Sequence, residues 1–253
     1  MKLIRDILLV YRRQMRFSLR MPQWLFFALV QPVMYLALFG PLLKPLTGTP
    51  GFPASDPWRF FVPGLIVQLG IFGVLYAGFG LVDQIRFGVI DRMRVSPVAR
   101  SAILLGQVLR DVTVMAGQTI ILTVAAIPFG LHLTWQAVVV GLVMVSLLAT
   151  GFASLSYGVA MLMKDEEPLI GLLNLVGPPL LLLSGILLPM SFGPSWLRTL
   201  ARINPVSHVV DGLRAAFRGH LVHADVGWGL LAAALTAIAA VAFATRAFQR
   251  ENA

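Results

Sequence analysis

The stretch that decides the fold is FFVPGLIVQLGIFGVLYAGFGLV, which occupies residues 60–82 and contains no charged side chain. A helix needs roughly 20 apolar residues to cross about 30 Å of hydrocarbon. Five further stretches approach this length: Trp24–Leu43, Val112–Gly130, Ala137–Met163, Pro168–Met190 and Gly227–Thr245. Only helices satisfy the backbone over such runs, because the strands of a membrane barrel alternate over about ten residues. The sequence therefore predicts an all-α integral membrane protein with six transmembrane helices.

Composition agrees with a membrane location. The chain has 253 residues, of which 58% are hydrophobic and 12% are charged, whereas a soluble domain carries about 25% charged residues. Too little polar surface remains to cover a water-soluble protein, so lipid must cover the rest. The absence of cysteine excludes disulfides and thiolate metal sites. Frequent Ala, Gly and Arg with few Lys favour a GC-rich bacterial source, and hence a bacterial cell membrane.

The basic residues indicate how the spans are oriented. A net charge of +9 would indicate nucleic acid on a soluble protein, but here the charges lie mostly between apolar runs, as the positive-inside rule requires. With the N-terminus in the cytoplasm, 14 Lys and Arg residues fall inside and 6 outside. Both termini are therefore predicted to be cytoplasmic. No small-residue cleavage site follows the first apolar run, so we expect that run to remain as a span rather than to be removed as a secretory signal.

Residues 1–22 precede the first span and predict a helix lying in the membrane interface. Apolar residues recur there at helical spacing while arginines line another face. The apolar positions are Ile4, Leu8, Tyr11, Met15 and Leu19. Such a helix can couple movement into the first span, or it can simply anchor the topology.

Residues 83–111 form a charged segment on the predicted cytoplasmic side, with a short helix expected over Gly88–Arg94. The Ser96-Pro97 pair should end it, because the residue before proline avoids the helical region. The residues of this helix are Gly88, Val89, Ile90, Asp91, Arg92, Met93 and Arg94. Apolar side chains ringed by charges suit docking into a groove on a soluble partner. A plain charged loop between spans is the alternative.

Residues 191–226 hold four of the six outer cations, which is an exception to the charge bias. Pro194-Ser195 can start a short helix that carries Trp196, and Asn204-Pro205 provides an N-cap with proline at the first helical position of a second one. Both helices are too short to span the membrane and too apolar to float free. We therefore expect an outer, re-entrant pair of helices. Their cations would reach headgroups by snorkelling: Arg198, Arg202, Arg214 and Arg218.

Other residues limit the chemistry that the chain can perform. The polar residues inside the predicted spans either line a substrate path or bond neighbouring helices. No Asp, Glu, Lys or His lies at the middle of a predicted span, which argues against a proton or sodium relay. No G-x-x-x-x-G-K-[ST] phosphate loop is present, so ATP hydrolysis would need another polypeptide. The histidine spacing indicates no metal site.

Three segments resemble the type-2 ABC exporter permeases, especially the daunorubicin-resistance type of drug and lipid exporter. They are Gly88–Pro97, Leu183–Met190, and the motifs from Trp196-Leu197 through Asn204-Pro205 to Asp211–Arg214. The resemblance covers nearly the whole chain. It implies a non-catalytic permease in which Gly88–Arg94 is the coupling helix that docks onto an ATPase subunit, and in which residues 191–226 form re-entrant outer helices.

The resemblance also implies partners and a cargo. ATP and Mg would be bound by the ATPase subunit, and a second permease, identical or different, would complete the pathway. The cargo would be an amphiphilic drug, lipid or polyketide-like molecule. The second and fifth spans would face it, with these residues on the path: Gln68, Phe72, Tyr76 and Asn174. Two competing hypotheses are an ion-gradient-driven carrier or channel that works without an ATPase, and an intramembrane enzyme or lipid-modifying scaffold.

Overall fold

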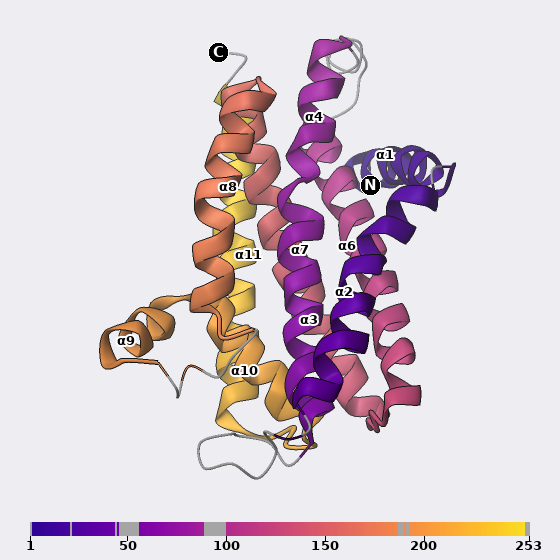
Figure 1. Ribbon diagram of the computed structural model, residues 1–253. Helices are drawn as coiled ribbons and strands as arrows, with labels where there is room; N and C mark the ends of the chain where they lie inside the picture. The colour runs from indigo at the N-terminus through magenta and orange to yellow at the C-terminus, as the bar shows by residue number, and fades with distance from the viewer. Residues whose placement is uncertain are drawn as a thin grey trace.

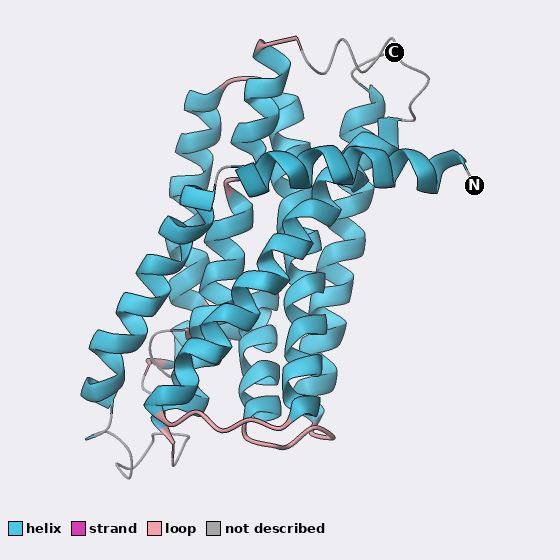
Figure 2. Ribbon diagram, turned by 90° about the vertical axis from the view of Figure 1, so that its right-hand side faces the viewer, coloured by secondary structure: helices cyan, strands magenta, loops and turns pink. Residues whose placement is uncertain are grey.

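The computed structural model describes residues 2–20, 22–43, 45, 56–88, 100–186, 190 and 193–250, except for the side chains of residues 22, 24, 25, 40, 41, 43, 100 and 250. The regular elements in these residues are all helices (Figure 2). In chain order they are α1 (Lys2–Arg20), α2 (Pro22–Leu43), α3 (Pro57–Leu75), α4 (Ala77–Arg86), α6 (Arg100–Ala126), the short η2 (Ile127–Phe129), α7 (Trp135–Met163), α8 (Glu166–Leu183), α9 (Ser195–Ile203), α10 (Pro205–Phe217) and α11 (Ala224–Arg250).

The helices are those of a membrane protein. Five helical stretches of the described residues are long and apolar enough to cross a bilayer: Pro57–Arg86, Ser101–Phe129, Trp135–Met163, Glu166–Leu183 and Ala224–Gln249. Within α2, Phe26–Phe39 forms a shorter apolar stretch. The predicted all-α membrane fold is confirmed. The count of six crossings and the re-entrant pair remain predictions.

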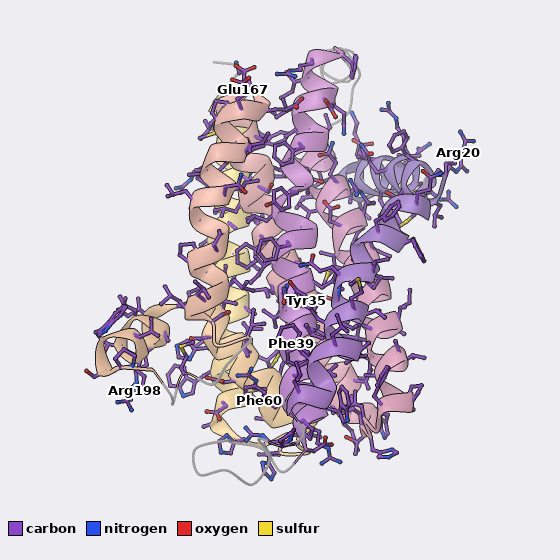
Figure 3. The ribbon with its side chains drawn as sticks, viewed as in Figure 1. Arg20, Tyr35, Phe39, Phe60, Glu167 and Arg198 are labelled. Atoms are coloured by element: carbon purple, nitrogen blue, oxygen red, sulfur yellow. The ribbon has the colours of Figure 1, made fainter. Side chains whose placement is uncertain are left out.

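The bundle has two distinct ends (Figure 1). The helix α1, the end of α4, the start of α6 and the end of α11 lie at one end, which we call the terminal end. The helix α10 lies at the opposite end, and α9 projects sideways from the bundle near it; we call this the α9–α10 end. Figure 3 shows Arg20 and Glu167 at the terminal end, and Phe60 and Arg198 towards the other. The helix α1 and the end of α11 thus lie at the same end of the bundle (Figure 1), and the cytoplasmic location of that end stays a prediction.

The helix α7 is the central one, because it contacts α3, α4, α6, α10 and α11. Its most extensive contact is with α11, whose buried residues repeat every three or four positions. Five of these buried residues are alanines: Ala233, Ala237, Ala240, Ala244 and Ala247. This spacing places a stripe of methyl groups along one side of α11, and small side chains let two helix backbones approach closely in lipid.

Two span boundaries differ from those predicted. The sequence places the third span at Val112–Gly130, but α6 begins at Arg100 and therefore contains Arg110 and Asp111. The sequence places the fifth span at Pro168–Met190, but α8 begins at Glu166, continues through Pro178 and Pro179, and ends at Leu183. Segments of irregular backbone follow that end, and Leu187–Pro189 lie outside the described residues.

The two short helices predicted within residues 191–226 are present as α9 and α10. The Asn204 side chain accepts a hydrogen bond from the Val206 amide at 3.0 Å, and Pro205 is the first residue of α10. The predicted N-cap is confirmed. The apolar residues of α10 are buried against the bundle, whereas Trp196 and Ile203 of α9 are exposed.

Candidate functional site at the two ends of the bundle

The helix α1 lies across the terminal end of the bundle and contacts α6 (Figure 2). Its arginines and the predicted apolar residues Ile4, Leu8 and Leu19 are exposed. A third face, formed by Asp6, Val10 and Gln14, is buried against the bundle. These residues lie four positions apart, so they form one row along the helix. The sequence predicts the exposed faces of α1 but not this row.

Three glutamines connect α1 to two other helices. The Gln84 Oε1 atom of α4 accepts hydrogen bonds from Gln14 Nε2 of α1 at 3.4 Å and from Gln107 Nε2 of α6 at 3.0 Å. The helices α4 and α6 lead into and out of residues 89–99. This glutamine cluster therefore joins α1 to both sides of the predicted coupling segment.

A close contact beside the glutamine cluster fixes α1 on α6. A Cβ atom at Gly106 of α6 would lie 2.7 Å from Val10 Cβ and 3.0 Å from the Ile7 carbonyl oxygen. The distance to Val10 Cβ is shorter than Cβ atoms adopt and the distance to the Ile7 oxygen is tight, so a residue without a side chain is needed for this approach. The position of α1 thus depends on a residue without a side chain.

Replacing Gly106 by alanine is expected to weaken the docking of α1 by about 1–3 kcal/mol, the usual cost of overpacking. Hydrogen exchange of the α1 amides would report the loss. Gly117 lies in the same helix, and a Cβ atom added to it would meet open space, with nothing within 4 Å. Gly117→Ala should therefore leave α1 unchanged and stabilise α6 by up to about 1 kcal/mol. Equal exchange in the two variants would contradict the predicted contact.

An ion-pair cluster connects α4 to the turn between α7 and α8. Arg86 lies 2.8 Å from Glu166 and 3.4 Å from Asp165. All three side chains are at least a third exposed, so the pairs contribute little stability. Lys164 begins this turn in the left-handed region, with φ of 58°. The pairs align the end of α4 with the start of α8.

The predicted coupling residues lie beside these contacts. Gly88 follows the end of α4 with φ of +63°, a left-handed conformation that favours glycine. The other six, Val89–Arg94, lie outside the described residues, so their predicted helix and docking role stay predictions. The structure shows that α4 and α6, which flank residues 89–99, are joined by the glutamine cluster, and that α4 is also held by the ion pairs of Arg86.

The four predicted pathway residues do not share one environment. Tyr76 and Asn174 are exposed, and Phe72 stacks on Tyr76 with ring centroids 6.4 Å apart. Phe72 also reaches Gly177 of α8, where a Cβ atom would lie 3.5 Å from its ring. Gln68, by contrast, is buried, and its Oε1 atom has no hydrogen-bond partner among the described residues. Phe72 and Tyr76 thus lie together where α3 meets α8, Asn174 is exposed on α8, and Gln68 lies inside the bundle.

A buried polar cluster in α6 and α7 is not among the predicted sites. The Asp111 Oδ1 atom pairs with Arg110 Nη1 at 2.8 Å, and Asp111 Oδ2 accepts a short hydrogen bond from the Tyr157 hydroxyl. Asp111 and Tyr157 are buried. Asp111 lies one residue before the predicted start of the third span at Val112, yet within the helix α6. Asp111 lies 11 residues into α6, or about 16 Å along its axis.

A second cluster lies at the α9–α10 end and centres on Arg214. Its Nε donates to the Phe60 carbonyl at 3.1 Å, and its Nη2 donates to the carbonyls of Gly185 and Ile186 at 2.8 and 3.2 Å. The guanidinium also lies 3.7 Å from the centre of the Phe60 ring. Arg214 is only 6% exposed, so its predicted snorkelling to headgroups is wrong. Burial lowers the pKa of Arg214 to about 10, and it stays a cation at neutral pH.

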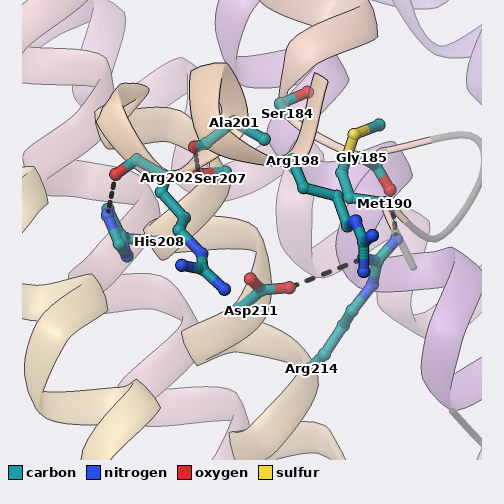
Figure 4. A pocket seen from close by; sticks show the side chains of 10 residues that line it. All are labelled: Ser184, Gly185, Met190, Arg198, Ala201, Arg202, Ser207, His208, Asp211 and Arg214. Carbon is teal, nitrogen blue, oxygen red and sulfur yellow. Dashed lines mark hydrogen bonds and ion pairs between the residues drawn. The ribbon is translucent and has the colours of Figure 1, made fainter. Parts of the chain in front are cut away.

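A cavity of about 220 Å³ opens beside Arg214 (Figure 4). Asp211 lies on its wall, 3.7 Å from Arg214, and His208 contacts the Arg202 carbonyl oxygen at 2.9 Å. The break after α8, together with α9 and α10, supplies the remaining lining residues: Ser184, Gly185, Met190, Arg198, Ala201, Arg202 and Ser207. The helices α9 and α10, which carry the Trp196, Asn204 and Asp211 motifs of the resemblance, thus supply most of the lining of this cavity.

Comparison with known proteins identifies the family. Residues 5–217 match the ABC-2 type transporter family. The chain is 27% identical over 252 residues to the daunorubicin resistance ABC transporter permease protein DrrB1 of Streptomyces coeruleorubidus, covering 96% of this chain and 86% of that one. It is 28% identical over 200 residues to nodulation protein J of Rhizobium leguminosarum bv. trifolii, covering 77% and 74%.

A third relative is named as a probable multidrug ABC transporter permease, YbhR of Escherichia coli strain K12. The identity is 29% over 168 residues, which cover 63% of this chain and 44% of the relative. The family match spans every helix from α1 to α10, including the glutamine cluster, the Asp111 cluster and Arg214. The chain belongs to the ABC-2 type transporter family.

Proposed function

We propose that this chain is the membrane-spanning permease subunit of an ATP-driven exporter in a bacterial cell membrane, with the terminal end in the cytoplasm. The observation that carries the proposal is the glutamine cluster. Gln84 ties α4, α6 and α1 together immediately beside residues 89–99. A force applied to that segment would therefore move two spans and the interfacial helix as one unit.

The mechanism is alternating access. Two permeases, identical or different, face each other, and two ATPase subunits bind ATP and Mg beneath them. Closure of the ATPases pushes on Gly88–Arg94 and rocks the spans from inward-facing to outward-facing. The cargo is an amphiphilic drug, lipid or polyketide-like molecule taken from the cytoplasm or the inner leaflet. The exposed side chains of Tyr76 and Asn174, with Phe72 between the helices, supply its path on the α3–α8 side.

The coupling role of residues 88–94 is tested by changing Ile90 and Met93 together to aspartate. Two carboxylates placed in an apolar groove would cost well over 1.4 kcal/mol, so recovery of the ATPase subunit should fall at least about tenfold. The measurement is affinity purification of this chain from its native membrane in mild detergent, with the co-purifying chains quantified by mass spectrometry.

Val222→Asp is the matched control, because Val222 is fully exposed between α10 and α11 at the opposite end. It adds a carboxylate without touching the predicted dock and should leave ATPase recovery unchanged. The wild-type preparation should contain a stoichiometric chain with a Walker motif, and it also reveals whether a second permease is present. Recovery of this chain alone, in a preparation that still moves substrate, would overturn the proposal.

The alternative of an ion-gradient-driven carrier draws on Asp111, since ionisable residues inside spans often belong to ion pathways. Both oxygens of Asp111 are already bonded, to Arg110 and Tyr157. Asp111 does not line the cavity beside Arg214, the one along α1 or the one between α7 and α11. A carrier would transport its substrate under an ion gradient without ATP, which the same purified chain would reveal after reconstitution.

A further inference from the structure

The cavity at the α9–α10 end has more positive charge than its own residues neutralise. Arg198, Arg202 and Arg214 line it, and Asp211 is its one carboxylate among the described residues. The balance is three cations against one anion, or +2 with His208 neutral. Arg218 and Asp225 also act on Asp211, and their opposite charges cancel. The cavity therefore attracts an anion.

Two of the three arginines are available to a ligand. Arg214 already donates hydrogen bonds to the backbone carbonyls of Phe60, Gly185 and Ile186. Arg198 and Arg202 are exposed, and within the described part of the chain no ion pair or side-chain hydrogen bond occupies either guanidinium. Both extend from α9 towards the Asp211 side of the cavity (Figure 4). A pair of planar guanidinium groups converging on one concave site matches the geometry of a phosphate.

The place of the cavity in the bundle favours a lipid headgroup as the source of that phosphate. It adjoins Ser184, immediately after the last residue of α8, and α10 packs on the start of α11, so the cavity lies at the level where spans end. Headgroups occupy this level of a bilayer whichever way the chain is oriented. The exposed Trp196, Leu200 and Ile203 of α9, beside the cavity, offer an apolar surface for an acyl chain.

We infer that this cavity binds a phosphate group through Arg198 and Arg202, with Arg214 holding the cavity walls in place. The bound phosphate has two possible sources, an anionic phospholipid of the surrounding bilayer or free phosphate from the aqueous side. The site does not depend on ATPase docking or on the cargo, so the result of its test is independent of the test of the proposed function.

Native mass spectrometry of the purified chain tests the inference. The chain is equilibrated with mixed micelles containing equal amounts of phosphatidylglycerol and phosphatidylcholine, and the bound lipids are counted. The wild-type chain should retain phosphatidylglycerol preferentially. The double variant Arg198→Gln, Arg202→Gln should lose about tenfold of that preference, since charge-assisted bonds to phosphate are the strong ones. Only protein that elutes at the wild-type position in size-exclusion chromatography is measured.

The control is the variant Arg246→Gln, which removes an exposed arginine of α11 near the opposite end of the bundle. It should keep the preference for phosphatidylglycerol. The charge-preserving variant Arg198→Lys, Arg202→Lys should retain an intermediate preference, because lysine keeps the charge but loses the planar fork. Equal retention of the two lipids by the wild-type chain, or unchanged preference in the Gln variant, would overturn the inference.

Inorganic phosphate distinguishes the two sources. If millimolar phosphate displaces phosphatidylglycerol from the wild-type chain, the phosphate group alone is recognised. If it does not, while the preference still depends on Arg198 and Arg202, the site requires the acyl chain as well. In that case Trp196→Ala, on the exposed side of α9, should weaken lipid retention although it leaves all the cavity charges in place. Both results support the site and differ only in its occupant.

Discussion

Replacing Asp111 by leucine is expected to destabilise the folded chain by about 3–5 kcal/mol, the usual loss when one member of a buried charged group is removed. The substitution leaves the Tyr157 hydroxyl without its acceptor in the interior and Arg110 without its carboxylate. Unfolding of the purified protein in detergent, followed by tryptophan fluorescence, would measure the change. Asp111→Asn should cost less, because its amide oxygen can still accept from Tyr157.

Removing all three side chains of the Asp111 cluster should destabilise the protein less than removing Asp111 alone. If Arg110→Leu and Tyr157→Phe are added to Asp111→Leu, no polar group of the cluster remains unpaired, and the triple variant should recover to within about 1 kcal/mol of wild type. Asp83→Leu, which removes an exposed carboxylate from α4, should change stability by less than about 0.5 kcal/mol. A fully stable Asp111→Leu variant would show that the bonds to α7 contribute nothing.

The Asp111 cluster also shows why one span boundary cannot be read from hydropathy. Arg110 and Asp111 together make the sequence look cytoplasmic, so hydropathy begins the span at Val112. The spacing of buried residues along the chain predicts the extent of α6 better than average hydropathy does. The buried residues of α6 continue in steps of three and four through the charged pair: Leu104, Val108, Asp111, Met115, Gln118 and Leu122. Periodicity extends the helix where average hydropathy ends it.

Contacts between residues far apart in the sequence are a second feature that the sequence alone does not predict. The sequence predicts an amphipathic helix within residues 1–22, and it predicts the cap at Asn204, because both depend on neighbours within a few positions. It cannot predict that Gln14 meets Gln84, 70 residues away, or that Arg214 meets Phe60, 154 residues away. The coupling role of residues 89–94 comes from resemblance, and the geometry of the helices around them comes only from the structure.

The orientation of Arg214 is a further feature that cannot be predicted from the local sequence. The positive-inside rule marks it as an outer cation, and outer cations near the interface ordinarily snorkel to headgroups. Here the α10 helix points it inward instead, because the break after α8 leaves backbone carbonyls there that need donors. No local feature of the sequence reveals that need, since the carbonyls belong to Gly185 and Ile186, which lie 29 and 28 residues earlier in the chain.

Replacing Arg214 by methionine is therefore expected to cost about 3 kcal/mol, because each buried carbonyl left unsatisfied costs about 1–3 kcal/mol. Water cannot easily replace the guanidinium at Ile186, where even a Cβ atom on Gly64 would lie 2.7 Å from the carbonyl oxygen. Detergent unfolding again provides the measurement. Arg246→Met, which removes an exposed arginine from α11, should change stability by less than about 0.5 kcal/mol.

The two clusters differ in whether a second substitution can rescue the first. The partners of Asp111 are side chains, so they can be removed with it, and the remaining apolar group packs without cost. The partners of Arg214 are main-chain carbonyls, which no substitution removes, so Arg214→Met should resist rescue by any change at Asp211 or Phe60. Arg214→Lys should fall between methionine and wild type, because one ammonium keeps the charge but cannot reach three carbonyls from one position. A lysine variant as stable as wild type would show that charge alone, rather than the guanidinium fork, holds α10 against α3 and the end of α8.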